Sequence, residues 1–272
     1  MLRRSSPKSS RDTMQPPPDH DLAAPTAITT TALTRQFSGF TAVDAIDLNI
    51  AKGSIHALVG PNGAGKTTLF NLLTGFLHPT SGTIHLGQED ITGSAPESIV
   101  HRGVARSFQI TSLFDDMTPV EHLELSLQNL DGHGYAFWRS GKILKQYDAR
   151  AMELLQYVGL ADLRRQKVGS LAYGQKRALE LAVALSLKPT VLLLDEPTAG
   201  MGAEDIDRTI ELVQQVAEDR TVVFVDHNMH VVSSLADRVT VMQQGKILAE
   251  GSYESVRADP RVVTAYLGGA HA

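Results

Sequence analysis

Apolar residues lie along this chain in short continuous runs, and the segments between the runs are predicted to be helices. The clearest runs are residues 191–194 and 222–225, each followed at once by an acidic residue. A short continuous apolar run is typical of a strand in a parallel sheet that is covered on both faces. Strands of this kind that alternate with helices indicate an α/β fold.

The pattern predicts regular elements along most of the chain after residue 26. Strands are expected at 27–50 (two strands joined near 36–40), 54–60, 83–86, 104–108, 191–195, 221–226, 239–242 and 246–250. Helices are expected at 68–73, 95–103, 118–127, 143–158, 175–187, 203–217 and 229–236, with two short ones near 253 and 262.

The stretch from 110 to about 175 interrupts the alternation because its pattern is mostly helical. Thr118, Pro119 and Glu121 form a capping box with proline at the first helical position, which predicts the start of a helix. We therefore expect a helical subdomain of about 110–175 nested in a domain of 27–272. Residues 1–26 are rich in serine, proline and charge, and are expected to be a disordered tail in which Met14 is an alternative start.

A glycine-rich stretch after the strand at 54–60 fits the phosphate-loop pattern G-x-x-x-x-G-K-[ST]. Its residues are Gly60, Pro61, Asn62, Gly63, Ala64, Gly65, Lys66 and Thr67, with Thr68 next. Glycines let the backbone curl so that successive N–H groups point at a phosphate, and the helix N-terminus adds partial positive charge there. Lys66 is expected to reach the β- and γ-phosphates of a nucleotide, and the Thr67 hydroxyl to bind Mg²⁺. The alternative is a glycine-rich turn without a ligand.

Two carboxylates end the apolar strand at 191–195. Asp195 is expected at the carboxyl end of that strand, where open α/β sheets bind ligands, and there it would hold Mg²⁺. Glu196 is next along the chain and would accept a proton from an attacking water. A strand that ends in two solvated acids is the alternative.

Composition excludes several other classes of protein. The 272 residues carry a net charge of −5, which argues against nucleic acid as a partner bound by a broad basic face. Cysteine is absent, so disulfides and thiolate metal sites are excluded. The apolar runs are too short to span a bilayer, and the N-terminus lacks the apolar segment of a secretory signal. We expect a soluble cytoplasmic protein.

A third motif precedes the helix expected at 175–187. It consists of Leu171, Ala172, Tyr173, Gly174 and Gln175. The motif resembles the signature sequence of ATP-binding cassette (ABC) proteins, and the resemblance covers about residues 27–267 with five motifs in the family's order. It implies the ABC ATPase fold: a RecA-like P-loop NTPase core with an antiparallel β portion and a nested helical subdomain.

The resemblance also implies roles for single residues. Phe37 corresponds to the aromatic residue that stacks on adenine, with Phe40 as its rival. Gln109 resembles the glutamine that touches Mg²⁺ or the attacking water, and His227 the histidine that contacts the γ-phosphate. The signature residues 171–175 would bind the nucleotide held by a second ABC ATPase subunit, in a homodimer or a heterodimer.

Two positions depart from the family pattern. Ala172 stands where a serine hydroxyl usually bonds the γ-phosphate, and Gly202 stands where an acid usually follows the second motif. Both departures concern contacts between subunits. Since Lys66, Asp195 and Glu196 are present, we expect ATP hydrolysis with ATP and Mg²⁺ as cofactors.

Within the family, the chain resembles the ATPases of importers for branched-chain and related amino acids, with urea and short-chain amide importers as the alternative. Tyr173 and the stretches 114–121 and 259–268 carry this resemblance. It implies an ATPase subunit at the inner face of the cell membrane, with membrane permease subunits as partners and a substrate-binding protein acting through the permease. One alternative is a soluble ABC ATPase of DNA repair or translation. The other is a P-loop kinase or regulatory nucleotide switch, and this class of protein would not explain the signature motif.

The resemblance also implies that a short permease helix docks in the groove beside Gln109, between the ATPase core and the helical subdomain. Phe114 ends the largely apolar stretch 110–114 that directly follows Gln109. Tyr135, Phe137 and Trp138 form an aromatic loop further along the chain. Aromatic residues are typical anchors of protein interfaces. The alternative is that these side chains cover the core of the helical subdomain itself.

Overall fold

The structure is a computed structural model of the chain, and it describes residues 25–107, 113–130 and 141–267. The expected tail 1–26 lies almost wholly outside these residues, as do Gln109 and the loop with Tyr135, Phe137 and Trp138.

A six-stranded sheet forms the centre of the molecule, with strand order β10-β9-β3-β8-β7-β6. The strands β9, β3, β8, β7 and β6 are mutually parallel, and β10 is antiparallel to β9. The strands are β3 (Ile55–Val59), β6 (Val104–Ser107), β7 (Val191–Asp195), β8 (Thr221–Val225), β9 (Arg238–Gln243) and β10 (Lys246–Gly251).

Both faces of this sheet are buried, which is why β7 and β8 are apolar at consecutive positions. Leu192 and Leu194 pack into one hydrophobic core, whereas Val191 and Leu193 pack into the other. Side chains alternate between the two faces of a strand, so a continuous apolar run supplies both cores.

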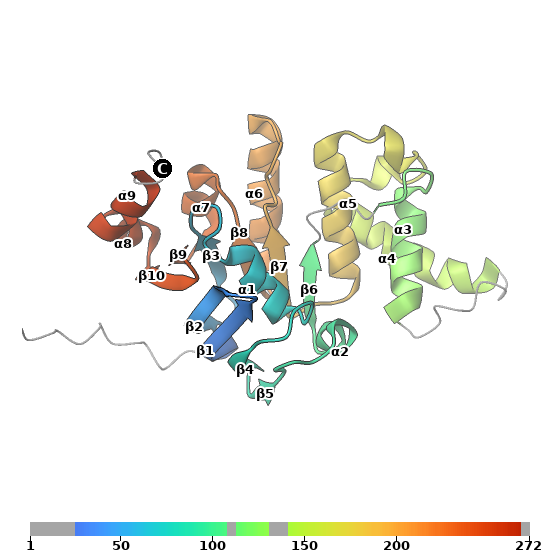
Figure 1. Cartoon of the computed structure of the whole chain (residues 1–272). Helices are drawn as coiled ribbons and strands as arrows, with labels where there is room; N and C mark the ends of the chain where they lie inside the picture. The colour runs from blue at the N-terminus through green and yellow to red at the C-terminus, as the bar shows by residue number, and fades with distance from the viewer. Residues whose placement is uncertain (1–24, 108–112, 131–140, 268–272) are drawn as a thin grey trace, which may run out of the picture.

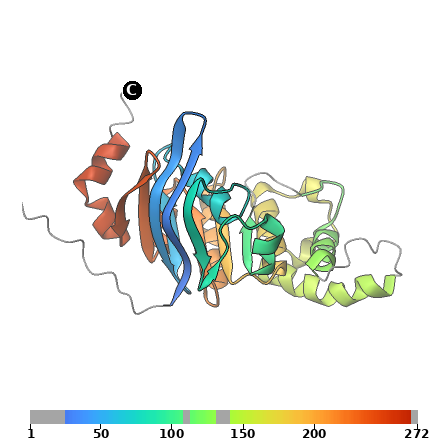
Figure 2. The same cartoon turned by 60° about the horizontal axis from the view of Figure 1, so that its bottom comes forward.

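The second core lies between the central sheet and a four-stranded antiparallel sheet of order β2-β1-β4-β5. Helix α1 (Lys66–Leu73) contributes Leu69, Phe70 and Leu72 to this core. The strands are β1 (Thr26–Phe37), β2 (Phe40–Ala51), β4 (Ser81–Leu86) and β5 (Glu89–Asp90). Figure 2 shows this sheet in blue and green beside the central one.

The remaining helices pack into the first core, except α2, whose Ile99 packs into the second. They are α2 (Pro96–His101), α3 (Pro119–Leu130), α4 (Gly141–Tyr157), α5 (Tyr173–Ser186), α6 (Ala203–Ala217), α7 (Met229–Leu235), α8 (Tyr253–Arg257) and α9 (Pro260–Leu267). In Figure 1, α3, α4 and α5 form one end of the molecule, and α8 and α9 form the other.

We call α3, α4, the 3₁₀ turns Ala161–Leu163 and Val168–Ser170, and the start of α5 the helical insert. Its helices pack on one another and share a hydrophobic core that is continuous with the first core of the sheet. The predicted capping box is present, since the Glu121 carboxylate accepts from the Thr118 N–H at 2.7 Å and the Glu121 N–H donates to the Thr118 hydroxyl at 3.4 Å. Among the residues that the structure describes, no helix has the length and apolar character needed to cross a bilayer.

Several helix ends differ from the sequence prediction by two or three residues, among them the starts of α1, α4 and α5 and the end of α3. Helix α5 was expected to begin at Gln175, but it begins at Tyr173, so part of the signature motif is helical. Ala172 is the N-cap in an extended conformation, and the Gln175 side chain accepts from the Ala172 N–H at 2.9 Å. This contact from the third helical residue draws two more residues into the first turn. The two-residue strand β5 was not predicted.

Candidate functional site

Four parallel strands end at the same edge of the central sheet, and the predicted chemical residues follow their ends. The phosphate loop follows β3, His227 follows β8, and Asp195 and Glu196 lie at the end of β7. The fourth strand, β6, leads toward Gln109, which lies outside the described residues. The carboxyl edge of a parallel sheet is the usual ligand site of such folds.

The phosphate loop closely approaches the backbone of two other segments, and glycine is required where it does. A Cβ atom on Gly60 would lie 2.2 Å from the Met242 carbonyl oxygen, and one on Gly65 would lie 2.4 Å from that of Ala42. Both glycines have positive φ, of 152° and 102°. Met242 belongs to β9 and Ala42 to β2, so the loop is held between both sheets.

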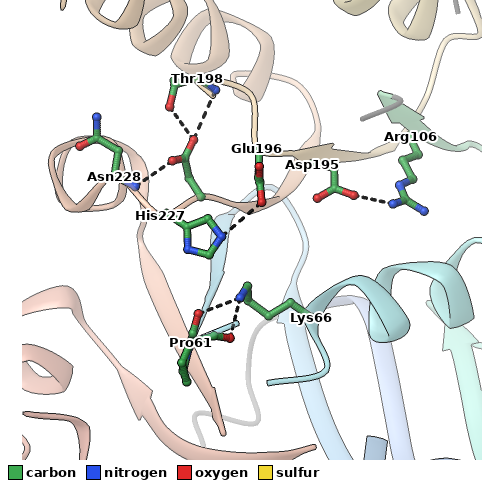
Figure 3. Close-up of polar contacts among 10 residues, drawn as sticks. Pro61, Lys66, Arg106, Asp195, Glu196, Thr198, His227 and Asn228 are labelled. Atoms are coloured by element: carbon green, nitrogen blue, oxygen red, sulfur yellow. Dashed lines mark hydrogen bonds and ion pairs between the residues drawn. The ribbon is translucent and has the colours of Figure 1, made fainter. Parts of the chain in front are cut away.

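Lys66 lies folded over its own loop. Its ammonium donates to the carbonyl oxygens of Gly60 at 2.7 Å and Pro61 at 3.1 Å (Figure 3). Burial lowers the pKa of Lys66, and the carboxylates of Glu196 and Asp195 oppose this shift. A charge held in this way is poised to exchange carbonyl oxygens for the oxygens of an anion. Thr67 is exposed in the first turn of α1.

Asp195 is only 2 % exposed and pairs with a residue that the sequence reasoning did not identify. The Arg106 guanidinium donates to Asp195 through Nη2 at 2.5 Å and to the Asn71 side-chain oxygen through Nη1 at 2.6 Å. It also lies over the Phe70 ring, 5.6 Å from its centroid. The signal in the sequence was an arginine inside the short strand β6.

Glu196 and His227 meet across the ends of β7 and β8. The His227 Nε2 atom lies 3.2 Å from a Glu196 carboxylate oxygen, as Figure 3 shows. Glu196 has a positive φ of 48°, and its N–H donates to the Val225 carbonyl at 2.8 Å. A non-glycine residue in this conformation costs free energy, and such strain is found most often at functional sites.

A second residue that sequence reasoning missed is Asp226, which holds the backbone on both sides of the pair. One of its carboxylate oxygens accepts from the Thr198 hydroxyl at 2.6 Å, and the other accepts from the Asn228 N–H at 2.8 Å. Its position directly before His227 was the available signal. These bonds tie the turn after β7 to the turn after β8, so they set the position of Glu196 relative to His227.

The signature residues 171–175 lie at the start of α5 in the helical insert, and not in the phosphate loop. The Tyr173 ring faces Gly200, and the Gly174 backbone faces the Asp205 carboxylate at the start of α6. Helix α5 packs on α3 and α4, whereas the phosphate loop leads into α1 between the two sheets. The chain therefore presents its phosphate loop and its signature as separate surfaces.

Phe37 and Phe40 face each other in the register of the β1–β2 hairpin, and are 42 % and 61 % exposed. The Arg35 guanidinium lies 4.7 Å from the centroid of the Phe37 ring. Ala42 of the same hairpin, two residues after Phe40, lies against Gly65 of the phosphate loop. The structure leaves either ring free to meet a planar ligand on an exposed face.

The oxygen ligands expected for Mg²⁺ are the Thr67 hydroxyl, the Asp195 carboxylate and the side chain of Gln109. Among the described residues, no group of three His, Cys, Asp or Glu side chains lies close enough to hold a metal ion by itself. Mg²⁺ fits such a sparse oxygen set, because it usually keeps several waters and takes its other ligands from phosphates. The buried Asp195 carboxylate is already balanced by a cation, Arg106, which shows that this position favours positive charge.

Comparison with known proteins identifies the family. Residues 43–199, more than half of the chain, match the ABC transporter family, and residues 246–272 match the branched-chain amino acid ATP-binding cassette transporter family. The high-affinity branched-chain amino acid transport ATP-binding protein BraF of Pseudomonas aeruginosa is 39 % identical over 87 % of this chain and 95 % of its own. LivG of Escherichia coli, which bears the same description, is 35 % identical with the same coverage.

Solved structures agree with the sequence comparison. A nucleotide-free ATP-binding cassette from an ABC transporter matches with a TM-score of 0.80 and 29 % identity, over 89 % of this chain and 98 % of that one. A cassette in its ADP conformation matches with a TM-score of 0.79 and 28 % identity, over 89 % and 99 %. The predicted ABC ATPase fold is thus confirmed, and the chain belongs to the ABC transporter family as one of its ATP-binding and ATP-hydrolysing cassettes.

Proposed function

We propose that this chain is the ATPase subunit of an importer for branched-chain or related amino acids. The observation that carries the substrate class is the match of residues 246–272 to the branched-chain cassette family, together with the names of BraF and LivG. The chemistry at the sheet edge supplies ATP hydrolysis, and the transported molecule is bound by other subunits.

Reconstitution tests this function. The chain would be combined in vesicles with candidate permease subunits and a substrate-binding protein, and uptake of radiolabelled leucine, urea and acetamide would be compared with and without ATP. ATP-dependent leucine uptake supports the proposal. Uptake of urea or acetamide alone would assign the chain to the alternative importer class, and no assembly with any permease would favour a non-transport ATPase.

Each motif residue has a proposed place around the nucleotide. The N–H groups from Gly60 to Thr68 surround the phosphates, and Lys66 exchanges its loop carbonyls for β- and γ-phosphate oxygens. Thr67, Asp195 and Gln109 would hold Mg²⁺, which neutralises charge on the phosphates when bound. Phe37 is proposed to stack on adenine, and Phe40 stays the alternative.

Hydrolysis needs a water in line with the γ-phosphate and a group to take its proton. Glu196 is proposed as that base, and its strained backbone holds the carboxylate next to His227, which follows β8. His227 contacts this carboxylate at 3.2 Å and is proposed to turn to the γ-phosphate when ATP is bound. Asp226 acts as the support that keeps the two turns in register.

A complete site is proposed to need two subunits, because signature and phosphate loop occupy separate surfaces of one chain. The signature of one subunit, residues 171–175, would meet the nucleotide on the phosphate loop of its partner. Ala172 lacks the hydroxyl for the γ-phosphate, so the backbone N–H groups at the start of α5 would carry this contact. With permease subunits as further partners, the assembly would lie at the inner face of the membrane.

The helical insert, proposed as a subdomain of about 110–175, offers Phe114 as a docking residue for the permease. Its ring is 59 % exposed and stacks on His122, with ring centroids 5.9 Å apart. The Phe114 N–H donates to His122 Nε2 at 2.8 Å, and His122 Nδ1 lies 2.9 Å from the Thr118 carbonyl. The ring is therefore held in place on the surface rather than covering the core.

Phe114→Ala is expected to leave the basal ATPase activity of the isolated subunit intact and to weaken permease binding by about 2 kcal/mol or more, because an exposed aromatic anchor is lost. ATPase activity and pull-down of the permease are measured together. Val263→Ala, an exposed apolar truncation on α9 at the other end of the molecule, is the control. Normal binding and transport by Phe114→Ala, or loss of its fold, would remove the docking role.

A further inference from the structure

We propose that Arg106 is a positioning residue that holds the Asp195 carboxylate in the nucleotide-free protein and competes with the metal ion for it. This inference rests on the proposed metal role of Asp195. Arg106 lies outside the sequence motifs, and in this proposal it controls how much Mg²⁺ contributes to the affinity for the nucleotide.

The contacts of Arg106 join three elements around the site. From β6, its side chain reaches Asp195 at the end of β7, and it reaches Asn71 and Phe70 on the helix that follows the phosphate loop. One terminal nitrogen of the guanidinium, Nη1, donates to Asn71 and the other, Nη2, donates to Asp195. The contact with the Asp195 carboxylate is therefore monodentate. Figure 3 shows the pair with Asp195, away from Lys66.

Burial strengthens the electrostatic interaction between Arg106 and Asp195. The side chains of Arg106 and Asp195 are 10 % and 2 % exposed, so water screens their charges little. A buried carboxylate without a cation is strongly disfavoured, and one cation must balance Asp195 in every state of the site. In the structure that cation is Arg106.

The other charged groups nearby do not fill this role. The Lys66 ammonium donates to the carbonyl oxygens of its own loop, and Glu196 faces His227. Lys66 is near enough to Asp195 and Glu196 for their charges to act on it, but no hydrogen bond among the described residues joins it to either.

A metal ion that arrives with ATP must share the same carboxylate. Because like charges repel, the Arg106 guanidinium lowers the affinity of the Asp195 carboxylate for a divalent cation as long as the two side chains remain paired. Asn71 and the Phe70 ring can keep the released side chain close by, and the Arg106 Nε atom is buried with no hydrogen-bond partner, so the site is not saturated. The pairing thus favours metal entry together with the anionic nucleotide over metal entry alone.

Binding of a labelled non-hydrolysable ATP analogue tests this inference without any turnover. Its dissociation constant is measured in excess Mg²⁺ and in EDTA, and the ratio of the two gives the metal's contribution to affinity. In Arg106→Gln this ratio is expected to be about tenfold larger or more than in the wild type, because the competing unit charge is gone. Arg106→Lys keeps the charge, so its ratio is expected to stay near that of the wild type.

A double-mutant cycle shows whether Arg106 acts through Asp195. In an Asp195→Asn background, Arg106→Gln is expected to leave the ratio unchanged. Asn71→Ala keeps the Arg106–Asp195 pair and removes the other hydrogen-bond partner of the guanidinium, so it serves as the second variant if Arg106→Gln does not fold. Because the competing charge stays and its alternative partner is lost, the ratio in Asn71→Ala is expected to be smaller than in the wild type. An unchanged or smaller ratio in folded Arg106→Gln, or an unchanged or larger ratio in Asn71→Ala, overturns the inference. If Asp195→Asn alone leaves the wild-type ratio intact, the metal role of Asp195 fails instead.

Discussion

Glu196→Gln is expected to keep ATP binding close to that of the wild type and to slow hydrolysis by roughly 10²–10⁴-fold, the usual contribution of a general base. Glutamine has nearly the same shape as glutamate and retains a side-chain oxygen for the His227 contact, so the strained turn should survive. It cannot accept the proton of the attacking water. Steady-state phosphate release and equilibrium binding of a labelled ATP analogue measure the two quantities separately.

The same variant reports on the second subunit. If hydrolysis releases the two-subunit complex, Glu196→Gln with ATP should form a stable dimer, seen by size-exclusion chromatography with light scattering. Glu254→Gln removes an exposed carboxylate on α8 and is the matched control, expected to hydrolyse ATP normally. Turnover near the wild-type rate in Glu196→Gln would show that another group takes the proton.

Lys66→Ala is expected to weaken ATP binding itself by about 10- to 100-fold, the range of a lost hydrogen bond to a charged group. The ammonium now lies on the Gly60 and Pro61 carbonyls, within the curve that would receive the phosphates. Its loss removes the point charge on the β- and γ-phosphates. Equilibrium binding of a labelled ATP analogue measures the change.

The control for Lys66 is Lys52→Ala, an exposed lysine in the turn before β3, at the far end of that strand from the phosphate loop. It removes the same charge at a distance and is expected to bind ATP normally. Melting curves of both variants check that the loop still folds. ATP affinity unchanged in a folded Lys66→Ala would contradict the phosphate-binding role of this side chain.

Sequence reasoning anticipated the elements of the two sheets because local patterns specify them. The helix over Ala203–Ala217 and the strand over Val191–Asp195 have the predicted bounds. The start of α5 was missed by two residues, since a side-chain contact from Gln175 to the Ala172 N–H extends the first turn. Helix ends depend on such single contacts more than on periodicity.

Some residues of the candidate site could be predicted from local sequence patterns, and others could not. The phosphate loop, Asp195 and Glu196 were predicted from the sequence because each combines an unusual residue pattern with the end of a predicted strand, and His227 was predicted from the family resemblance. The structure brings all of them to one edge of the central sheet, and their roles stay predictions. Asp226 was passed over, since its carboxylate works through Thr198, which is 28 residues earlier in the chain. The role of Gln109 stays a prediction, as the residue lies outside the part of the chain that the structure describes.

The sequence by itself determined that the chain is an α/β protein with a phosphate loop and a signature motif, because these features are contiguous and their chemistry depends on local backbone and residue type. Only the tertiary structure decided that Arg106 balances Asp195, which lies 89 residues away, and that loop and signature lie apart. Charge balance in a buried site depends on which distant strands become neighbours. Here the parallel pairing of β6 with β7 brings the two residues together, and no local pattern encodes that contact.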